Sequence, residues 1–161
     1  MSNNRSKTIG TNAETGLVRY LQANGWAHAE RRALRGEFDA GDVTGTPGLC
    51  WEMKAGAQCA KPSVKQIYEW MAETETERRN AGAEIGVLVL RRPGVGPARA
   101  GHWLTYLSLH AVATLATDAP LLAALDGPLV VAPLQLTLAT TCELLVAAGY
   151  GTPPKNGINH A

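Results

Sequence analysis

The sequence predicts an α/β protein in which helices flank a central mixed sheet, with elements in the order α-β-β-β-α-β followed by an apolar C-terminal extension. Two observations carry this prediction. Two stretches have helix-capping signals, and several short apolar runs lie between turns that contain Gly or Pro, as strands do. The chain has 161 residues, of which 45% are hydrophobic and 18% are charged. Such a chain is most simply one domain, residues 1–161, with a sizeable core.

The first predicted helix begins at Thr11 or Asn12, either of which can cap its amino end, and Gly25 is well placed to end it. The apolar residues that share one face of this helix are Leu17, Val18 and Leu21. The two ends of the chain, residues 1–10 and 151–161, are largely polar, and we expect both to be loose tails.

The strands are predicted as short segments separated by turns. "WAHAERRAL" favours a first strand and residues 36–39 a turn, and residues 42–44 favour a second strand that turns at "GTPG" into the third, "LCWEMKA". The second helix, "SVKQIYEWMAETETERRNAG", is expected to begin at its cap Ser63, to end near Gly82 and to expose its acidic run "ETETERR". "EIGVLVLRR" has the pattern of a buried strand, and "HWLTYLSL" is expected to form another.

Net charge and cysteine content restrict the classes of protein to which the chain could belong. The formal net charge is only +1, although 14 of the 15 Lys and Arg residues lie in residues 1–100, which weakly favours contact with a polyanion. The three cysteines are odd in number and lack CxxC spacing, so they indicate reduced thiols rather than disulfides or a zinc site. The amino end lacks the apolar segment of a secretory signal, and we expect a cytoplasmic protein.

The stretch "GDVTGTPGLCWEMK" at residues 41–54 brings charged side chains together. Alternate residues of a strand share a face, so one face of "LCWEMK" is apolar and the other holds Glu52 and Lys54, roughly 7 Å apart along the strand. Asp42 lies on the preceding strand, which the turn folds back beside this one. The core-facing set is Leu49, Trp51 and Met53, and the opposite set is Cys50, Glu52 and Lys54.

Two clustered carboxylates repel each other unless a cation lies between them. Hard oxygen ligands with open water positions suit Mg²⁺ or Mn²⁺. Such a metal polarises a phosphoryl oxygen and lowers the pKa of its bound water, while a neighbouring lysine orients or stabilises the attacking hydroxide. The sequence therefore predicts a site that cleaves phosphodiesters, with Asp42 and Glu52 as metal ligands and Lys54 assisting the water.

This arrangement resembles the PD-(D/E)xK nuclease superfamily, with Asp42 as the motif aspartate and "EMK" at residues 52–54 as the ExK. The predicted element order matches the restriction-endonuclease-like core of that superfamily, here about residues 11–110. The resemblance itself covers roughly residues 8–92.

The resemblance implies further site residues. Glu14, in the first helix, matches the helical glutamate of archaeal-type Holliday junction resolvases and RecB-like nucleases, where it would bind a second metal or its water shell. Gln66 matches a glutamine of many members, and the Met53 carbonyl would be a third metal ligand. The chain departs from the pattern at Gly41, where members carry proline, at "RRALRG", which offers no catalytic-loop serine, and at Trp70, where some RecB-like members carry tyrosine.

The function implied is that of a Mg²⁺-dependent DNA endonuclease, a Holliday junction resolvase in recombination, repair or phage DNA processing. Cutting two symmetry-related strands implies a homodimer with two sites on a twofold axis. The alternatives are a restriction-type or RecB-like nuclease of the same fold and a catalytically silent DNA-binding module. The basic side chains that could line the DNA path are Arg31, Arg32, Arg35, Lys61 and Lys65.

Each of these residues also has a plainer interpretation. Glu52 and Lys54 could be a solvated pair on an exposed strand, and Glu14 a first-turn acid favoured by the helix dipole. Asp39 competes with Asp42 as the relevant aspartate. The apolar residues 103–149 must partly complete the sheet, and we expect the excess, including Leu121, Leu122 and Leu125, to form the subunit interface.

Overall fold

A computed structural model describes residues 2–33, 39–117 and 130–160 of the chain, with side chains described from residue 7 onward. Through the fourth strand the elements follow the predicted order, α-β-β-β-α-β. The helices are α1 (Ser2–Ala23), α2 (Val64–Asn80), α3 (Leu109–Leu115) and α5 (Leu138–Ala147), with short 3-10 helices η1 (Ala57–Cys59) and η2 (Pro97–His102). The strands are β1 (Glu30–Arg31), β2 (Val43–Thr44), β3 (Leu49–Lys54), β4 (Ile85–Leu90), β5 (Leu104–Ser108) and β6 (Pro133–Thr137).

The main sheet has four strands in the order β3-β4-β5-β6. β3 and β4 are parallel, with Leu49 opposite Ile85 and Lys54 opposite Leu90, and α2 makes the crossover between them. β5 and β6 add antiparallel pairs, so the sheet is mixed, as predicted. β1 and β2 form a separate two-stranded ribbon that adjoins β3.

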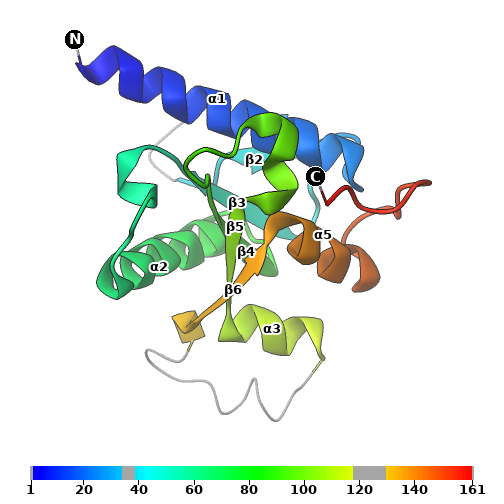
Figure 1. The fold of residues 1–161 in the computed structure, drawn as a ribbon. Helices are drawn as coiled ribbons and strands as arrows, with labels where there is room; N and C mark the ends of the chain where they lie inside the picture. Colours follow the sequence, from blue (N-terminus) through cyan, green and yellow to red (C-terminus); the bar gives the residue numbers. More distant parts are fainter. Residues whose placement is uncertain (1, 34–38, 118–129, 161) are drawn as a thin grey trace.

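β4 is buried along its whole length, which shows that both faces of the main sheet are covered. One face packs under α1, η2 and α5, where Trp26 and Trp51 contact edge to face with ring centroids 5.9 Å apart. The other face packs on α2 around Trp70, Met71 and Leu88. Figure 1 shows α1 and α2 on opposite sides of the strands. The predicted alternation of β3 is confirmed, since Leu49, Trp51 and Met53 all lie in the core under α1.

The two ends of the chain differ from the prediction. Residues 2–10 belong to α1, which begins at Ser2 rather than at Thr11 or Asn12. The C-terminal segment is not a loose tail, because it forms hydrogen bonds to residues just after the carboxyl end of α1. The Thr152 N–H donates to the Gly25 carbonyl, and the Asn159 N–H donates to the Asn24 side chain. Ile158 of this segment is partly buried against the core, and this contact helps to hold the segment in place.

Two local predictions need correction. Of the described residues 26–33 of "WAHAERRAL", Glu30 and Arg31 alone are in a strand, because Trp26 and Ala29 turn into the core before it begins. The acidic run of α2 is only partly exposed. Thr74, Glu75 and Glu77 are buried, because the same helix face carries Trp70 down onto the sheet.

The C-terminal part completes the sheet, as predicted, through β5, β6 and the helices α3 and α5. Within the described ranges, no helix is both long and apolar enough to cross a membrane. Leu121, Leu122 and Leu125, expected at a subunit interface, lie outside the described residues, as does Arg35.

Candidate functional site

β3 carries Glu52 and Lys54 on the face that α2 covers. The opposite face of β3 packs into the core that contains Trp26 and Trp51. The Lys54 Nζ atom lies 2.7 Å from Glu52 Oε1 and 2.9 Å from Oε2 of Glu73 on α2. Glu52 is 7% exposed and Lys54 is half-buried. The interpretation as a solvated pair is therefore wrong for Glu52, because its carboxyl group lies inside the protein.

Asp42 is positioned against β3 by two hydrogen bonds. Its backbone N–H donates to the Trp51 carbonyl over 2.7 Å, and its Oδ2 atom accepts from the Met53 N–H over 2.8 Å. The Glu52 carboxyl group is close enough that its negative charge raises the pKa of Asp42. The sequence prediction that the turn brings Asp42 beside Glu52 is thus confirmed.

Gly41 has a backbone conformation that excludes proline at this position. Its φ of 84° lies in the left-handed region, which proline cannot adopt. A Cβ atom there would lie 2.7 Å from Cys50 Sγ and 2.9 Å from the Trp51 carbonyl oxygen. A glycine therefore lets the chain approach β3 closely enough for Asp42 to bond to it.

Glu77 of α2 is the acid that the sequence analysis missed. It is 6% exposed, and its negative charge raises the pKa of Glu52. Asp39 and Asp42 add to the negative potential around it. Helical spacing could have found it, since Trp70, Thr74 and Glu77 recur at intervals of four and three residues on one face.

The pKa values of Asp42, Glu52 and Glu77 are all raised. Burial, followed by the repulsion of Glu52, raises the pKa of Asp42 from 3.8 to about 7. Burial likewise raises the pKa of Glu52 and of Glu77 from 4.5 to about 7, although Lys54 works in the opposite direction on both. Such values follow when carboxyl groups are desolvated together with too little positive charge.

Lys54 remains a cation. Its burial lowers its pKa, but attraction to Glu52 and hydrogen bonds to Glu52 and Glu73 outweigh that effect, and the net pKa is raised. An ammonium group with a raised pKa donates hydrogen bonds and stabilises negative charge, and it is a poor proton acceptor at neutral pH.

The structure supports less strongly the two site residues that only the resemblance implied, Glu14 and Gln66. The charge of Glu14 contributes to the raised pKa of Asp42, but the hydrogen-bond partner of Glu14 is Arg31, whose Nε lies 2.8 Å from Glu14 Oε2. Gln66 is not brought into the cluster. Its amide donates to Glu69 over 3.1 Å, and it lies seven residues, or about 10 Å, before Glu73 along α2.

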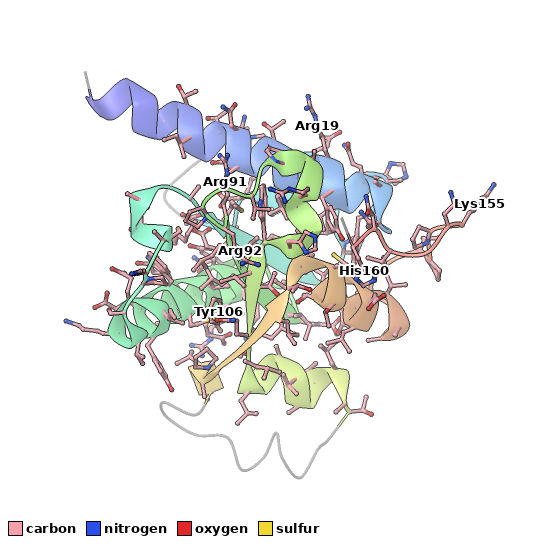
Figure 2. The ribbon with its side chains drawn as sticks, viewed as in Figure 1. Arg19, Arg91, Arg92, Tyr106, Lys155 and His160 are labelled. Atoms are coloured by element: carbon pink, nitrogen blue, oxygen red, sulfur yellow. The ribbon has the colours of Figure 1, made fainter. Side chains whose placement is uncertain are left out.

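The predicted DNA-binding residues are mostly exposed but dispersed. Arg31 pairs with Glu14, Lys65 lies 3.7 Å from Glu69, and Arg32 and Lys61 are exposed. The sequence analysis did not consider Arg91 or Arg92, which follow β4. The Arg91 N–H donates to the Lys54 carbonyl, so this pair leaves the sheet beside the cluster. In Figure 2, Arg91 and Arg92 lie below α1, whereas Lys155 projects from the C-terminal segment.

A groove of about 870 Å³ lies elsewhere on the molecule, and none of the clustered acids lines it. It is bordered by Trp26, Tyr150 and the residues around them in the C-terminal segment.

The donor atoms of the cluster suit a hard divalent cation, because all of them are carboxylate oxygens. Within the described part of the chain, no group of three or more His, Cys, Asp or Glu side chains is arranged around a metal position. The carboxyl group of Glu52 instead forms an ion pair with Lys54. One oxygen stands apart: Glu77 Oε2 is buried and has no hydrogen-bond partner. The residue types fit a cation, which would have to separate the carboxyl groups.

No family model, curated protein or solved structure matches the chain.

Proposed function

We propose that this protein is a metal-dependent DNA endonuclease that resolves four-way junctions as a homodimer. The observation that carries the proposal is the convergence of Asp42, Glu52 and Lys54. They come from two separate segments, and they form one desolvated cluster with a single ammonium group.

The roles follow from the contacts of each residue. Asp42 and Glu52 would hold a Mg²⁺ or Mn²⁺ ion, which, when bound, polarises the phosphate and activates water. Lys54 stays protonated, so it would orient the nucleophile and stabilise the negative charge that develops on the phosphate. Glu14 would add negative charge from α1, and the Met53 carbonyl remains a candidate ligand. Gln66 would have at most a supporting role, because its amide bonds to Glu69.

Phosphate binding would use the basic residues that border the cluster. Arg91 and Arg92 leave β4 beside Lys54, and Arg32 borders Asp42 through the bond from its N–H to the Asp42 carbonyl. A planar guanidinium group suits phosphate oxygens. We therefore expect Arg91→Ala together with Arg92→Ala to weaken junction binding more than Lys61→Ala does, in a gel-shift titration at fixed salt.

The proposed dimer is supported by apolar surface in the C-terminal part. Leu134 of β6 and Leu144 of α5 are each 44% exposed, and they border one apolar depression with Leu107 and Leu115. A twofold contact through such a surface would set the spacing of two active sites. Leu134→Glu with Leu144→Glu should convert a dimer to a monomer in sedimentation velocity. A wild-type monomer at micromolar concentration would favour a single-site nuclease.

The deciding experiment compares substrates and cations. A mobile four-way junction, a linear duplex and a single strand are incubated with the protein in Mg²⁺, Mn²⁺, Ca²⁺ or EDTA. We expect symmetric cuts in the junction with Mg²⁺ or Mn²⁺ and none with Ca²⁺ or EDTA. Cutting of linear DNA alone would indicate a nuclease of other specificity. Full activity in EDTA would contradict the metal mechanism. Binding without cutting in any cation would indicate a catalytically silent module.

A further inference from the structure

Glu77 has an unusual environment for a buried acid. Its side chain is 6% exposed, and its Oε2 atom has no hydrogen-bond partner. A buried polar atom left without a partner destabilises the fold. Glutamine would fill the same space and could donate a hydrogen bond to Glu52 without a charge. Packing alone therefore does not explain a carboxylate here.

The charges around Glu77 do not balance. Glu52 and Glu73 share the single ammonium group of Lys54. Asp42 and Glu77 add two further carboxyl groups beside Glu52. The Arg31 guanidinium is already engaged with Glu14. A cation between Glu52 and Glu77 would balance their charges and would also provide a partner for the unpaired Oε2 of Glu77.

We propose that Glu77 is a cation-binding residue of this site, so that α2 supplies a third carboxylate to the divalent cation held by Asp42 and Glu52. The inference rests on the proposed function for the class of cation, Mg²⁺ or Mn²⁺. It departs from the residues implied by the family resemblance, which place the helical contribution at Gln66. The register of α2 against β3 explains the difference. Glu73 pairs with Lys54 over 2.9 Å, and Glu77 lies one helical turn farther along α2, toward Glu52, whereas Gln66 lies about two turns away in the other direction.

Mn²⁺ binding to the full-length protein, measured by electron paramagnetic resonance without DNA, tests the proposal. Glu77→Gln keeps the shape and removes the charge, and should weaken Mn²⁺ binding at least about 10-fold. Glu69→Gln is the matched control, because Glu69 is a half-exposed acid of the same helix paired only at the surface, and it should leave Mn²⁺ binding unchanged. Unchanged Mn²⁺ binding by Glu77→Gln, or no Mn²⁺ binding by the wild type, overturns the proposal.

A second variant keeps the test decisive if Glu77→Gln does not fold. Glu77→Asp retains the charge but shortens the reach, and should bind Mn²⁺ more weakly than the wild type. Binding equal to that of the wild type would count against a ligand role. The outcome is also separable from that of the cleavage experiment. Mn²⁺ binding that depends on Glu77 in a protein that cuts no DNA would refute the nuclease proposal alone, and cutting with Mn²⁺ binding indifferent to Glu77 would refute this inference alone.

Discussion

Two buried glutamates on α2, Glu75 and Glu77, lie two residues apart and have opposite environments. Glu75 accepts two hydrogen bonds of 2.8 Å from Arg78 and one of 3.0 Å from Arg79. Although burial raises its pKa, the two arginines outweigh burial and lower it. Glu77 is equally buried but meets other carboxyl groups, and burial raises its pKa to about 7.

The comparison separates a structural acid from a candidate functional one. Glu75 has its counter-charges on its own helix, three and four residues along, so the group is complete without any ligand. The cluster of Asp42, Glu52 and Glu77 draws on three elements and is under-neutralised by Lys54. Perturbed pKa values of this kind concentrate at functional sites, because an incomplete charge balance is what a ligand can complete.

Removing Lys54 should give the largest effect, because it takes the only described ammonium group from the under-neutralised cluster. Lys54→Ala should reduce junction cleavage by at least ~10²-fold while leaving junction binding within a few-fold. Single-turnover cleavage and gel-shift titration measure the two quantities. Lys155→Ala, which removes an exposed lysine of the C-terminal segment, is the control. Normal cutting by Lys54→Ala would mean that Glu52 and Lys54 have only a structural role.

Removing the charge of Glu75 should destabilise the protein, whereas removing that of Glu77 should not. Glu75→Gln leaves Arg78, whose side chain is 17% exposed, without its carboxylate, and should lower the free energy of unfolding by about 2–3 kcal/mol. Glu77→Gln should raise this free energy in EDTA at pH 8. Urea denaturation of both variants makes the measurement. Equal losses in the two variants would show that both acids are structural.

The two clusters should also respond to pH in opposite directions. Asp42, Glu52 and Glu77 have a pKa of about 7 in the folded protein, above their usual values of 3.8 and 4.5. The folded state therefore keeps protons that the unfolded chain releases, and the unfolding free energy should fall as pH rises from about 4 to 7, by on the order of 1–3 kcal/mol.

The contribution of Glu75 has the opposite sign, because its folded pKa is lowered. Its stabilisation is present above its usual pKa of 4.5 and is lost as pH falls through the lowered folded value. Urea denaturation in EDTA from pH 4 to 8 should therefore show a decline in the wild type and a shallower one in Glu77→Gln. A flat wild-type profile across this window would contradict the desolvation of the three acids.

Removing Arg79 should have the smallest effect on the free energy of unfolding. It tests how much each arginine contributes to the ion pairs of Glu75. The Arg79 side chain is 67% exposed, so Arg79→Ala should cost less than about 1 kcal/mol of unfolding free energy. Arg78→Ala should cost more, because Arg78 also donates to the Ala83 carbonyl over 2.6 Å. Comparable losses in the two variants would mean that exposure does not weaken the outer ion pair.

The sequence by itself determined the local features of the site. Alternation in "LCWEMK" placed Glu52 and Lys54 on one face, and the turn before it brought Asp42 within reach. The α2 cap at Ser63 was also predictable, and its hydroxyl accepts from the Gln66 N–H. These features depend on strand pleat, turn chemistry and capping, which act between residues close in the chain.

Only the tertiary structure decided which elements face one another. Helical spacing groups Glu77 with Trp70, but it does not specify that this face meets β3 with Glu77 beside Glu52 and with Gln66 beyond it. Likewise, the start of α1 at Ser2 and the pairing of Glu14 with Arg31 could not be read from the segments alone. Whether a buried acid is neutralised depends on charges brought in by other elements, and their register is set by packing of the whole core.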